Sequence, residues 1–242
     1  MRLNLVESTG IQKYLLYAVG EIALVVIGIL LALQINNWNE SRKEQKVEVD
    51  LLKGLRQSIL DGYDLLNNSI EGNKRAMRSG EIILGAIEDD LPYHDSLAIH
   101  FEQSNIWWAI NLRTDAYDNV KSHGMEFIKD DTSRVALAFL YDTQLNFAKR
   151  LEERQSLYHY NTVTPVLNEL FESIDHHWFI ATKGNIPYDF ETLKQNMKYK
   201  SILRTNISNR DNYNGWILFM LNTMENLDIR ILEEINTLED NQ

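Results

Sequence analysis

The 242-residue sequence has no cysteine, only three prolines and eleven glycines. Without cysteine there are no disulfides, thiolate nucleophiles, cysteine-based zinc sites or acylated lipoprotein anchors. The absence of cysteine does not determine the cellular compartment, because a disulfide-free protein can lie on either side of a bacterial inner membrane. The scarcity of proline and glycine leaves few positions for turns and extended loops, so the composition favours helices.

Basic residues are also scarce: 24 Lys and Arg stand against 35 Asp and Glu, and the net charge is −11. The first 38 residues hold two of each kind, so the whole excess of negative charge belongs to the rest of the chain. An acidic domain repels phosphate backbones, and no basic stripe appears. Nucleic acid is therefore not an expected partner.

Catalytic and cofactor-binding motifs are absent as well, since the sequence has no G-x-S-x-G, P-loop, G-x-G-x-x-G or H-E-x-x-H pattern. The densest histidine cluster is Asp175, His176 and His177. Adjacent helical residues point about 100° apart and cannot easily share one metal. A site that combines Asp175 or Glu172 with a histidine from another helix is the alternative. We expect no catalytic, cofactor-binding or metal-ligating residues; an enzyme would need a convergent pocket that the sequence does not display.

What the sequence does have is a long apolar run, Tyr14–Ile35, in which thirteen of 22 residues are Leu, Ile or Val. As a helix it would extend about 33 Å, close to the hydrocarbon thickness of a bilayer. Those side chains contribute on the order of −4 to −8 kcal/mol to insertion, whereas the off-centre Glu21 costs less than about 3 kcal/mol. We therefore predict a transmembrane helix over residues 14–38, after a short tail of residues 1–13.

Two other interpretations of this run compete with a membrane span. A cleaved signal peptide has a shorter apolar run and a small-residue exit, whereas this run leaves through Gln34, Asn36 and Trp38. A buried helix of a soluble protein would be unusually apolar on every side. Tyr14 and Tyr17 at one end and Trp38 at the other suit the aromatic belts of a membrane interface. These features favour the span.

One face of the predicted span differs from the rest. Steps of three and four residues define a stripe at coiled-coil spacing: Ala18, Glu21, Val25, Gly28, Ala32 and Ile35. Gly28 and Ala32 form a small-xxx-small pair, which lets two backbones approach closely. We predict that this face packs against another helix and that protonated Glu21 hydrogen-bonds across the interface. Proton carriage by Glu21, or its snorkelling to the nearer membrane surface, are the alternatives.

Two blocks of the sequence are distinctive: the first is YLLYAVGEIALVVIGILLALQINNWNE, and the second is TDAYDNVKSHGMEFIKDDTSRVALAFLYD. Together they resemble an uncharacterised family of single-pass membrane proteins from flavobacteria and other Bacteroidota. The most specific part is GEI followed by an aliphatic run and an Asn-rich exit. The resemblance implies an anchor, a bacterial origin and a helical remainder, and it implies no activity.

The rest of the chain, residues 39–242, predicts an acidic domain built as an antiparallel helical bundle, so the expected fold class is all-α. Apolar residues recur at three and four from Leu52 to about Ile87, and the next helix follows Asp95 and carries Trp107 and Trp108. Further helices are predicted from Thr114 to Gly124, from Thr132 to a break at Pro165, from Asp189 to about Tyr199, and through the last apolar series, Tyr213–Leu238. No run of alternating residues bounded by hairpin turns stands out.

These features favour a non-enzymatic interaction or scaffold protein of the bacterial envelope. The expected partners are the lipid bilayer and either a second copy of the chain or another membrane protein. An accessory subunit of an ion-driven or transport complex that uses Glu21, or a ligand-sensing domain that works through a partner, are the alternatives. Basic residues after the span, such as Arg42 and Lys43, slightly favour a cytoplasmic domain, but they alternate with acids in a long domain, where that rule weakens. We expect an inner-membrane protein with its large domain in the periplasm, the usual arrangement of a signal anchor.

Overall fold

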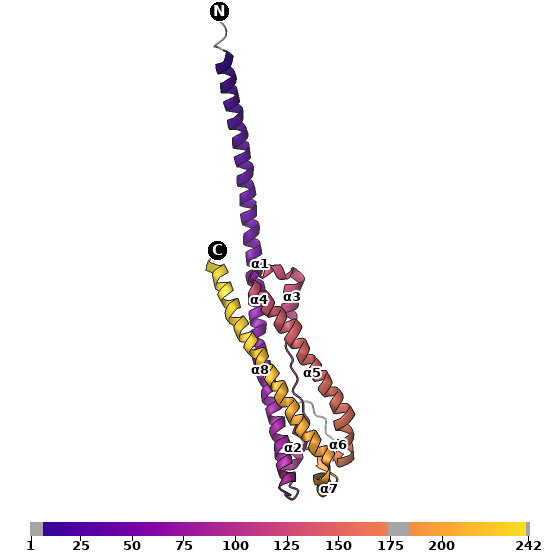
Figure 1. Cartoon of the computed structure of the whole chain (residues 1–242). Helices are drawn as coiled ribbons and strands as arrows, with labels where there is room; N and C mark the ends of the chain where they lie inside the picture. The colour runs from indigo at the N-terminus through magenta and orange to yellow at the C-terminus, as the bar shows by residue number, and fades with distance from the viewer. Residues whose placement is uncertain (1–6, 174–183, 241–242) are drawn as a thin grey trace, which may run out of the picture.

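The computed structural model describes residues 7–173 and 184–240. Its first helix, α1 (Glu7–Glu88), runs for 82 residues without a break. Figure 1 shows that the N-terminal part of α1 projects alone from a bundle to which the C-terminal part belongs. The described residues are almost entirely helical, with one short two-stranded sheet. The predicted fold class, an apolar N-terminal helix that continues into a helical domain, is therefore confirmed.

The centre of the domain is an antiparallel pair formed by α1 and the last helix, α8 (Met197–Asp240) (Figure 1). Both helices carry apolar residues three and four apart, so each buries one stripe against the other. The end of α8 lies beside the point where α1 enters the domain, since the Gln45 side-chain amide donates to the Leu238 carbonyl at 2.5 Å. Fully buried side chains of this pair include Leu52, Leu55, Ile59, Leu66, Ile217, Met220, Met224, Leu227 and Ile231.

A third rod packs against this pair. It comprises α4 (Asp131–Ala138), a π-helical segment η2 (Phe139–Gln144), α5 (Leu145–Tyr158), a second π-helical segment η3 (His159–Val163) and α6 (Thr164–Leu170). The sequence predicts a helix here with a break at Pro165. The chain stays helical through Pro165, but the turn before it widens to π geometry, because proline donates no hydrogen bond to the preceding turn.

The remaining elements are short: α2 (Leu97–Gln103), α3 (Asp115–His123), η1 (Met125–Phe127), β1 (Phe171–Ser173), β2 (Ile186–Pro187) and α7 (Phe190–Gln195). The prediction that the helix after Asp95 carries Trp107 and Trp108 is wrong, because α2 ends at Gln103 and both tryptophans lie in the extended segment after it. The antiparallel pairing of β1 with β2 has no counterpart in the sequence prediction. Asp189 does cap α7, as expected, and accepts from the backbone amides of Glu191 and Thr192.

The buried apolar residues form two clusters. The larger one follows the α1–α8 pair, α3 and the part of the rod from α4 to α5, near the end of the domain where α1 enters. The smaller one occupies the far end, where Phe101 contacts Phe171, Phe190 and Tyr199 at ring-centroid distances of 5.1–6.4 Å. The domain is therefore well packed along its whole length, in contrast to the first part of α1.

Candidate functional site

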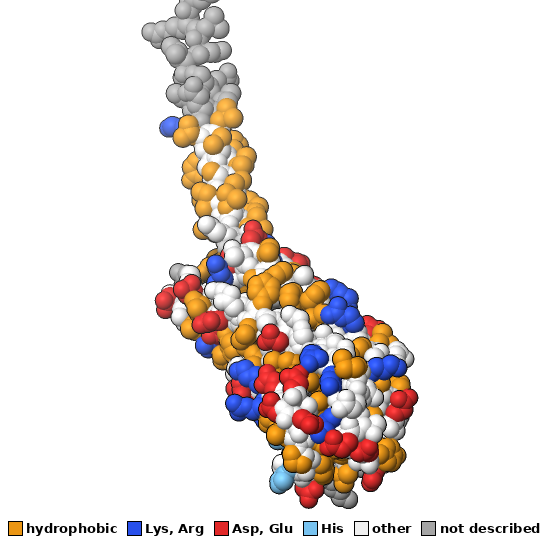
Figure 2. Space-filling view, turned by 60° about the horizontal axis from the view of Figure 1, so that its bottom comes forward, with side chains coloured by type: hydrophobic (Ala, Val, Ile, Leu, Met, Phe, Trp, Pro, Cys, Tyr) orange, Lys and Arg blue, Asp and Glu red, His pale blue; other side chains and the backbone are white. Residues whose placement is uncertain are grey.

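The exposed part of α1 is the most unusual surface of the molecule. Every described side chain from Lys13 to Glu44 is exposed except Ala18, which is partly covered. Large apolar side chains on all sides of the helix are open, for example Leu16 at 79% and Leu24 at 73%. Figure 2 shows this stretch as an apolar column that ends where the charged surface of the domain begins. By length and composition α1 is a candidate membrane span.

The residues of the predicted interface all lie on this exposed stretch. Glu21, Val25, Gly28, Ala32 and Ile35 are open, and no atom lies within 4 Å of a side-chain carbon built onto Gly28. The α-helical backbone brings these residues to one face, but nothing else in the described chain touches that face. The packing of this face against another helix stays a prediction.

Aromatic side chains mark both ends of the apolar column. Tyr14 and Tyr17 are 82% and 84% exposed, and Trp38 is 61% exposed. The guanidinium of Arg42 lies 5.1 Å from the centre of the Trp38 ring, which places a cation and an amphipathic ring side by side at the boundary with the domain. Such pairs suit a lipid headgroup region, where an apolar body and a polar tip are both solvated.

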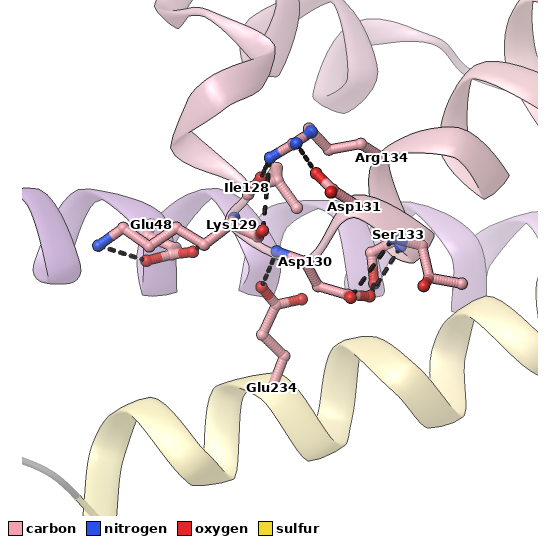
Figure 3. Close-up of polar contacts among 9 residues, drawn as sticks. Glu48, Ile128, Lys129, Asp130, Asp131, Ser133, Arg134 and Glu234 are labelled. Atoms are coloured by element: carbon pink, nitrogen blue, oxygen red, sulfur yellow. Dashed lines mark hydrogen bonds and ion pairs between the residues drawn. The ribbon is translucent and has the colours of Figure 1, made fainter.

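Directly below the column, α1 is fastened to the domain by a polar cluster that we call the basal junction: Glu48, Lys129, Asp130 and Glu234. Figure 3 shows Glu48 of α1 and Glu234 of α8 both reaching the loop between η1 and α4. Glu48 is only 1% exposed. Its carboxylate accepts from the Lys129 backbone amide at 2.9 Å and lies 3.5 Å from the Lys129 ammonium. A buried carboxylate that is paired in this way fixes the loop to α1.

The other half of the basal junction is held by α8. The Asp130 backbone amide donates to Glu234 at 3.3 Å, while the Asp130 carboxylate caps α4 by accepting from the Ser133 amide at 2.8 Å. Burial raises the pKa of the Glu234 carboxyl above its usual range, and the nearby charges of Glu48 and Asp130 act in the same direction. The Asp130 pKa is lowered, chiefly by its hydrogen bonds to Ser133. The junction thus joins α1, α8 and the loop before α4. The pKa of one of its carboxyl groups, Glu234, is raised, and that of another, Asp130, is lowered.

Sequence reasoning missed the basal junction, although a signal exists. Glu48 lies one helical turn before Leu52 and two turns before Leu55, and Glu234 lies between Ile231 and Leu238, so both acids interrupt apolar stripes. An acid on a core-facing stripe needs a partner, because a buried charge without one is costly. The partner, the backbone of a loop about eighty or a hundred residues away, has no pattern in the sequence.

The other candidate residues do not form a site. His94 contacts Ser96, His100 contacts Ser79, and His123 contacts the Asn119 carbonyl. Within residues 7–173 and 184–240 no group of three metal-ligating side chains converges. The cluster of Asp175, His176 and His177 lies outside the described residues.

The side chains around Asp115, in the second sequence block, and the pair Trp107 and Trp108 are engaged mainly in contacts within the domain. Asp115 pairs with Arg113 at 2.9 Å, and the Tyr117 hydroxyl donates to Asp142 at 2.6 Å, so local and inter-helix contacts engage these side chains. Both Trp107 and Trp108 are partly buried, and Trp108 lies directly on Gly72 of α1. Trp107 also packs against the larger buried cluster, whereas part of the Trp108 ring is exposed.

Comparison with protein families gives a match to part of α1. Residues 21–83 match a family of unknown function (DUF6090), which covers most of the apolar column and nearly all of the part of α1 that lies in the domain. Neither the curated proteins nor the solved structures contain a match to the chain. The resemblance to an uncharacterised family is thus supported for α1. The second block, residues 114–142, lies outside the match, and no activity comes with it.

Proposed function

We propose that this chain is a single-pass, membrane-anchored interaction protein of the bacterial inner membrane, without enzymatic activity. The observation that carries the proposal is the apolar column of α1, which is exposed on every side and packs on nothing in the described chain. A column of this size in water would expose far more contiguous apolar surface than soluble monomers tolerate. A bilayer covers it without any other protein, and its length fits.

In this proposal the domain is a rigid scaffold that a partner recognises, and the stripe through Gly28 and Ala32 joins the chain to a second copy or to another membrane protein. Small residues on one side of an otherwise bulky helix favour close helix contact. Glu21 strengthens that contact when protonated, because a neutral carboxyl can donate and accept across the interface. We place the domain on the periplasmic side.

The anchor is tested by fractionation of native cells. Full-length protein should stay in the membrane pellet after alkaline carbonate and dissolve only with detergent. A variant with Leu24→Arg and Ile27→Arg replaces two apolar contributions by penalties of about 2.5–3.5 kcal/mol each, which offsets the favourable sum of the column. It should lose the pellet fraction. Wild-type protein that is soluble after lysis without detergent would overturn the anchor.

The helix interface is tested by the mass of the complex after gentle detergent extraction. Gly28→Leu should lower the mass, because the larger side chain keeps the backbones apart, whereas Gly20→Leu is the matched control on another face of the same helix. Glu21→Gln should preserve the complex and Glu21→Leu should weaken it. A loss of function in Glu21→Gln with an intact complex would instead favour the proton-carrying, transport-subunit alternative. Equal masses for both glycine variants would contradict the interface.

The side of the membrane can be read directly because the chain has no cysteine. Ser201→Cys places the sole thiol on an exposed position of α8 in the domain. A membrane-impermeant maleimide should label this thiol in intact spheroplasts if the domain is periplasmic. Labelling that requires lysis would place the domain in the cytoplasm.

A further inference from the structure

A cleft of about 170 Å³ lies in the side of the domain, between α5, α8 and the extended segment after α2. We call it the aromatic cleft. Residues of its wall include Trp107, Arg154, Tyr158, Asn209, Asn212 and Tyr213. Its walls come from three segments that the sequence prediction did not bring together.

The aromatic side of the cleft is rigidly held. The Trp107 and Tyr213 rings are 5.0 Å apart, and the Tyr213 hydroxyl donates to Glu152. The Ile110 backbone amide is shared between Glu152 at 2.8 Å and the Tyr213 hydroxyl at 3.0 Å. Because these bonds tie the extended segment to both helices, the aromatic wall is formed before any ligand arrives.

A buried cation lies behind that wall. Arg210 is 1% exposed, its guanidinium is 5.5 Å from the Trp107 ring centre, and it donates to the carbonyls of Ser104 and Ile106, both at 2.8 Å. No carboxylate of the described residues forms an ion pair with it, and burial lowers its pKa to about 10. It therefore keeps its charge at neutral pH and places a positive charge behind the Trp107 wall of the cleft.

The open side of the cleft also carries two side chains whose hydrogen-bond donors have no acceptor within the described part of the chain. Arg154 on α5 and Asn212 on α8 are exposed and make no hydrogen bond or ion pair with the described part of the chain. Glu152 is not part of the cleft wall, and its carboxylate already accepts from Ile110 and Tyr213. The cleft thus offers an aromatic wall, a guanidinium and a carboxamide that face one another across two helices.

We propose that the aromatic cleft binds a small organic anion that has one planar ring and one carboxylate. The ring packs against Trp107 and Tyr158, and the carboxylate lies between Arg154 and Asn212. A cavity of about 150 Å³ is known to hold a single benzene ring, so the volume suits this class of ligand. Charge-assisted bonds from arginine to a carboxylate are the strong contribution, and Arg210 adds a long-range one.

The probe for this site is benzoate, with benzamide as the neutral ligand of the same shape. Titration calorimetry on the full-length protein in detergent, corrected with protein-free micelles, should give benzoate a Kd in the range of about 0.1–10 mM. Benzamide should bind at least about tenfold more weakly, because it lacks the charge that the guanidinium recognises. This test does not depend on the proposed anchor, because calorimetry reports on the cleft in the domain. The mass of the complex in the same detergent reports separately on the helix interface.

Two substitutions separate this site from non-specific binding. Arg154→Gln and Asn212→Asp should each weaken benzoate by about tenfold or more, the second because a carboxylate repels the ligand. The matched controls are Arg150→Gln on the same helix α5 and Asn222→Asp on α8, both exposed and outside the cleft wall. These should bind like the wild type.

All four positions are exposed, so the fold should persist, and the far-ultraviolet spectrum checks it. No measurable benzoate binding by the wild type, equal affinity for benzamide, or an equal effect of Arg150→Gln and Arg154→Gln would each overturn the proposed site.

Discussion

Gly72 offers the sharpest test of how the extended tryptophan segment is held. A side-chain carbon built onto Gly72 would overlap the Trp108 ring, so the ring occupies the space that any other residue would need. The ring cannot swing away easily. The Trp108 backbone is bound on both sides by Asn73, whose side chain donates to its carbonyl at 3.0 Å and accepts from its amide at 3.2 Å. We predict that Gly72→Ala destabilises the domain.

The magnitude follows from two opposing effects. Replacing glycine by alanine inside a helix contributes about 1 kcal/mol of stability through helix propensity. Forcing a methyl group into occupied space costs about 1–3 kcal/mol. Gly54 of the same helix is the matched control, because nothing lies within 4 Å of a carbon built there. Gly54→Ala should raise the free energy of unfolding by about 1 kcal/mol, and Gly72→Ala should lie about 1–3 kcal/mol below it.

Chemical denaturation of the full-length protein in detergent measures both variants against the wild type. Removing the obstacle gives a second check: in a Trp108→Ala background, Gly72→Ala should become stabilising, like Gly54→Ala. If Gly72→Ala were as stable as Gly54→Ala, the close contact between α1 and the Trp108 ring would be wrong.

Other predictions address the core, a helix cap and the basal junction. Ile231→Ala should cost about 2–5 kcal/mol because Ile231 is fully buried, whereas Ile229→Ala, at a position 52% exposed, should change the unfolding free energy by less than about 0.5 kcal/mol; similar costs for both would contradict the orientation of α8. Asp189→Ala should cost about 1 kcal/mol by removing the cap of α7, and Asp189→Asn should restore most of it; an unchanged stability of the alanine variant would refute the cap. Burial raises the Glu234 pKa, so the folded state binds the proton of Glu234 more tightly than the unfolded state does. The resulting contribution to the unfolding free energy is fully present below pH 4.5 and is lost as pH rises through the raised pKa of the folded state. Glu234→Gln keeps the acceptor oxygen but not this titration, so denaturation at pH 4.5 and 7.5 should differ less in the variant than in the wild type, and a larger difference would be the opposing result.

The long helices were predictable because their signal is local. The series Leu52, Leu55 and Ile59 on α1 and the series through Ile217 and Ile231 on α8 each repeat at helical spacing over many turns, and all of these residues are buried. Two helix boundaries were also predicted from local signals. Gly124 follows the end of α3 with a φ of 110°, and Asp189 caps the start of α7.

What the sequence did not reveal depends on contacts between distant segments. Trp107 and Trp108 look like helix residues by spacing, but the segment is extended because Asn73, Glu152 and Arg210 satisfy its backbone groups from three helices, α1, α5 and α8. No local pattern encodes those partners. The pairing of β1 with β2 is equally non-local, since the two strands are too short to show an alternation. The aromatic cleft is built from these same long-range contacts, which is why no motif marked it.

The continuity of α1 has a consequence for how the proposed anchor and the domain would work together. An α-helix without a proline or a break transmits rotation and tilt along its axis, and α1 runs unbroken from the apolar column into the larger buried cluster. The basal junction then fixes α1 to the α4 loop and to α8 at the point where it enters the domain. A partner that binds the face of Gly28 and Ala32 would therefore set the orientation of the whole domain, including the aromatic cleft. A flexible linker in the same place would let the domain turn independently of the anchor. The unbroken helix therefore favours a scaffold whose domain is held at a defined orientation to its partner.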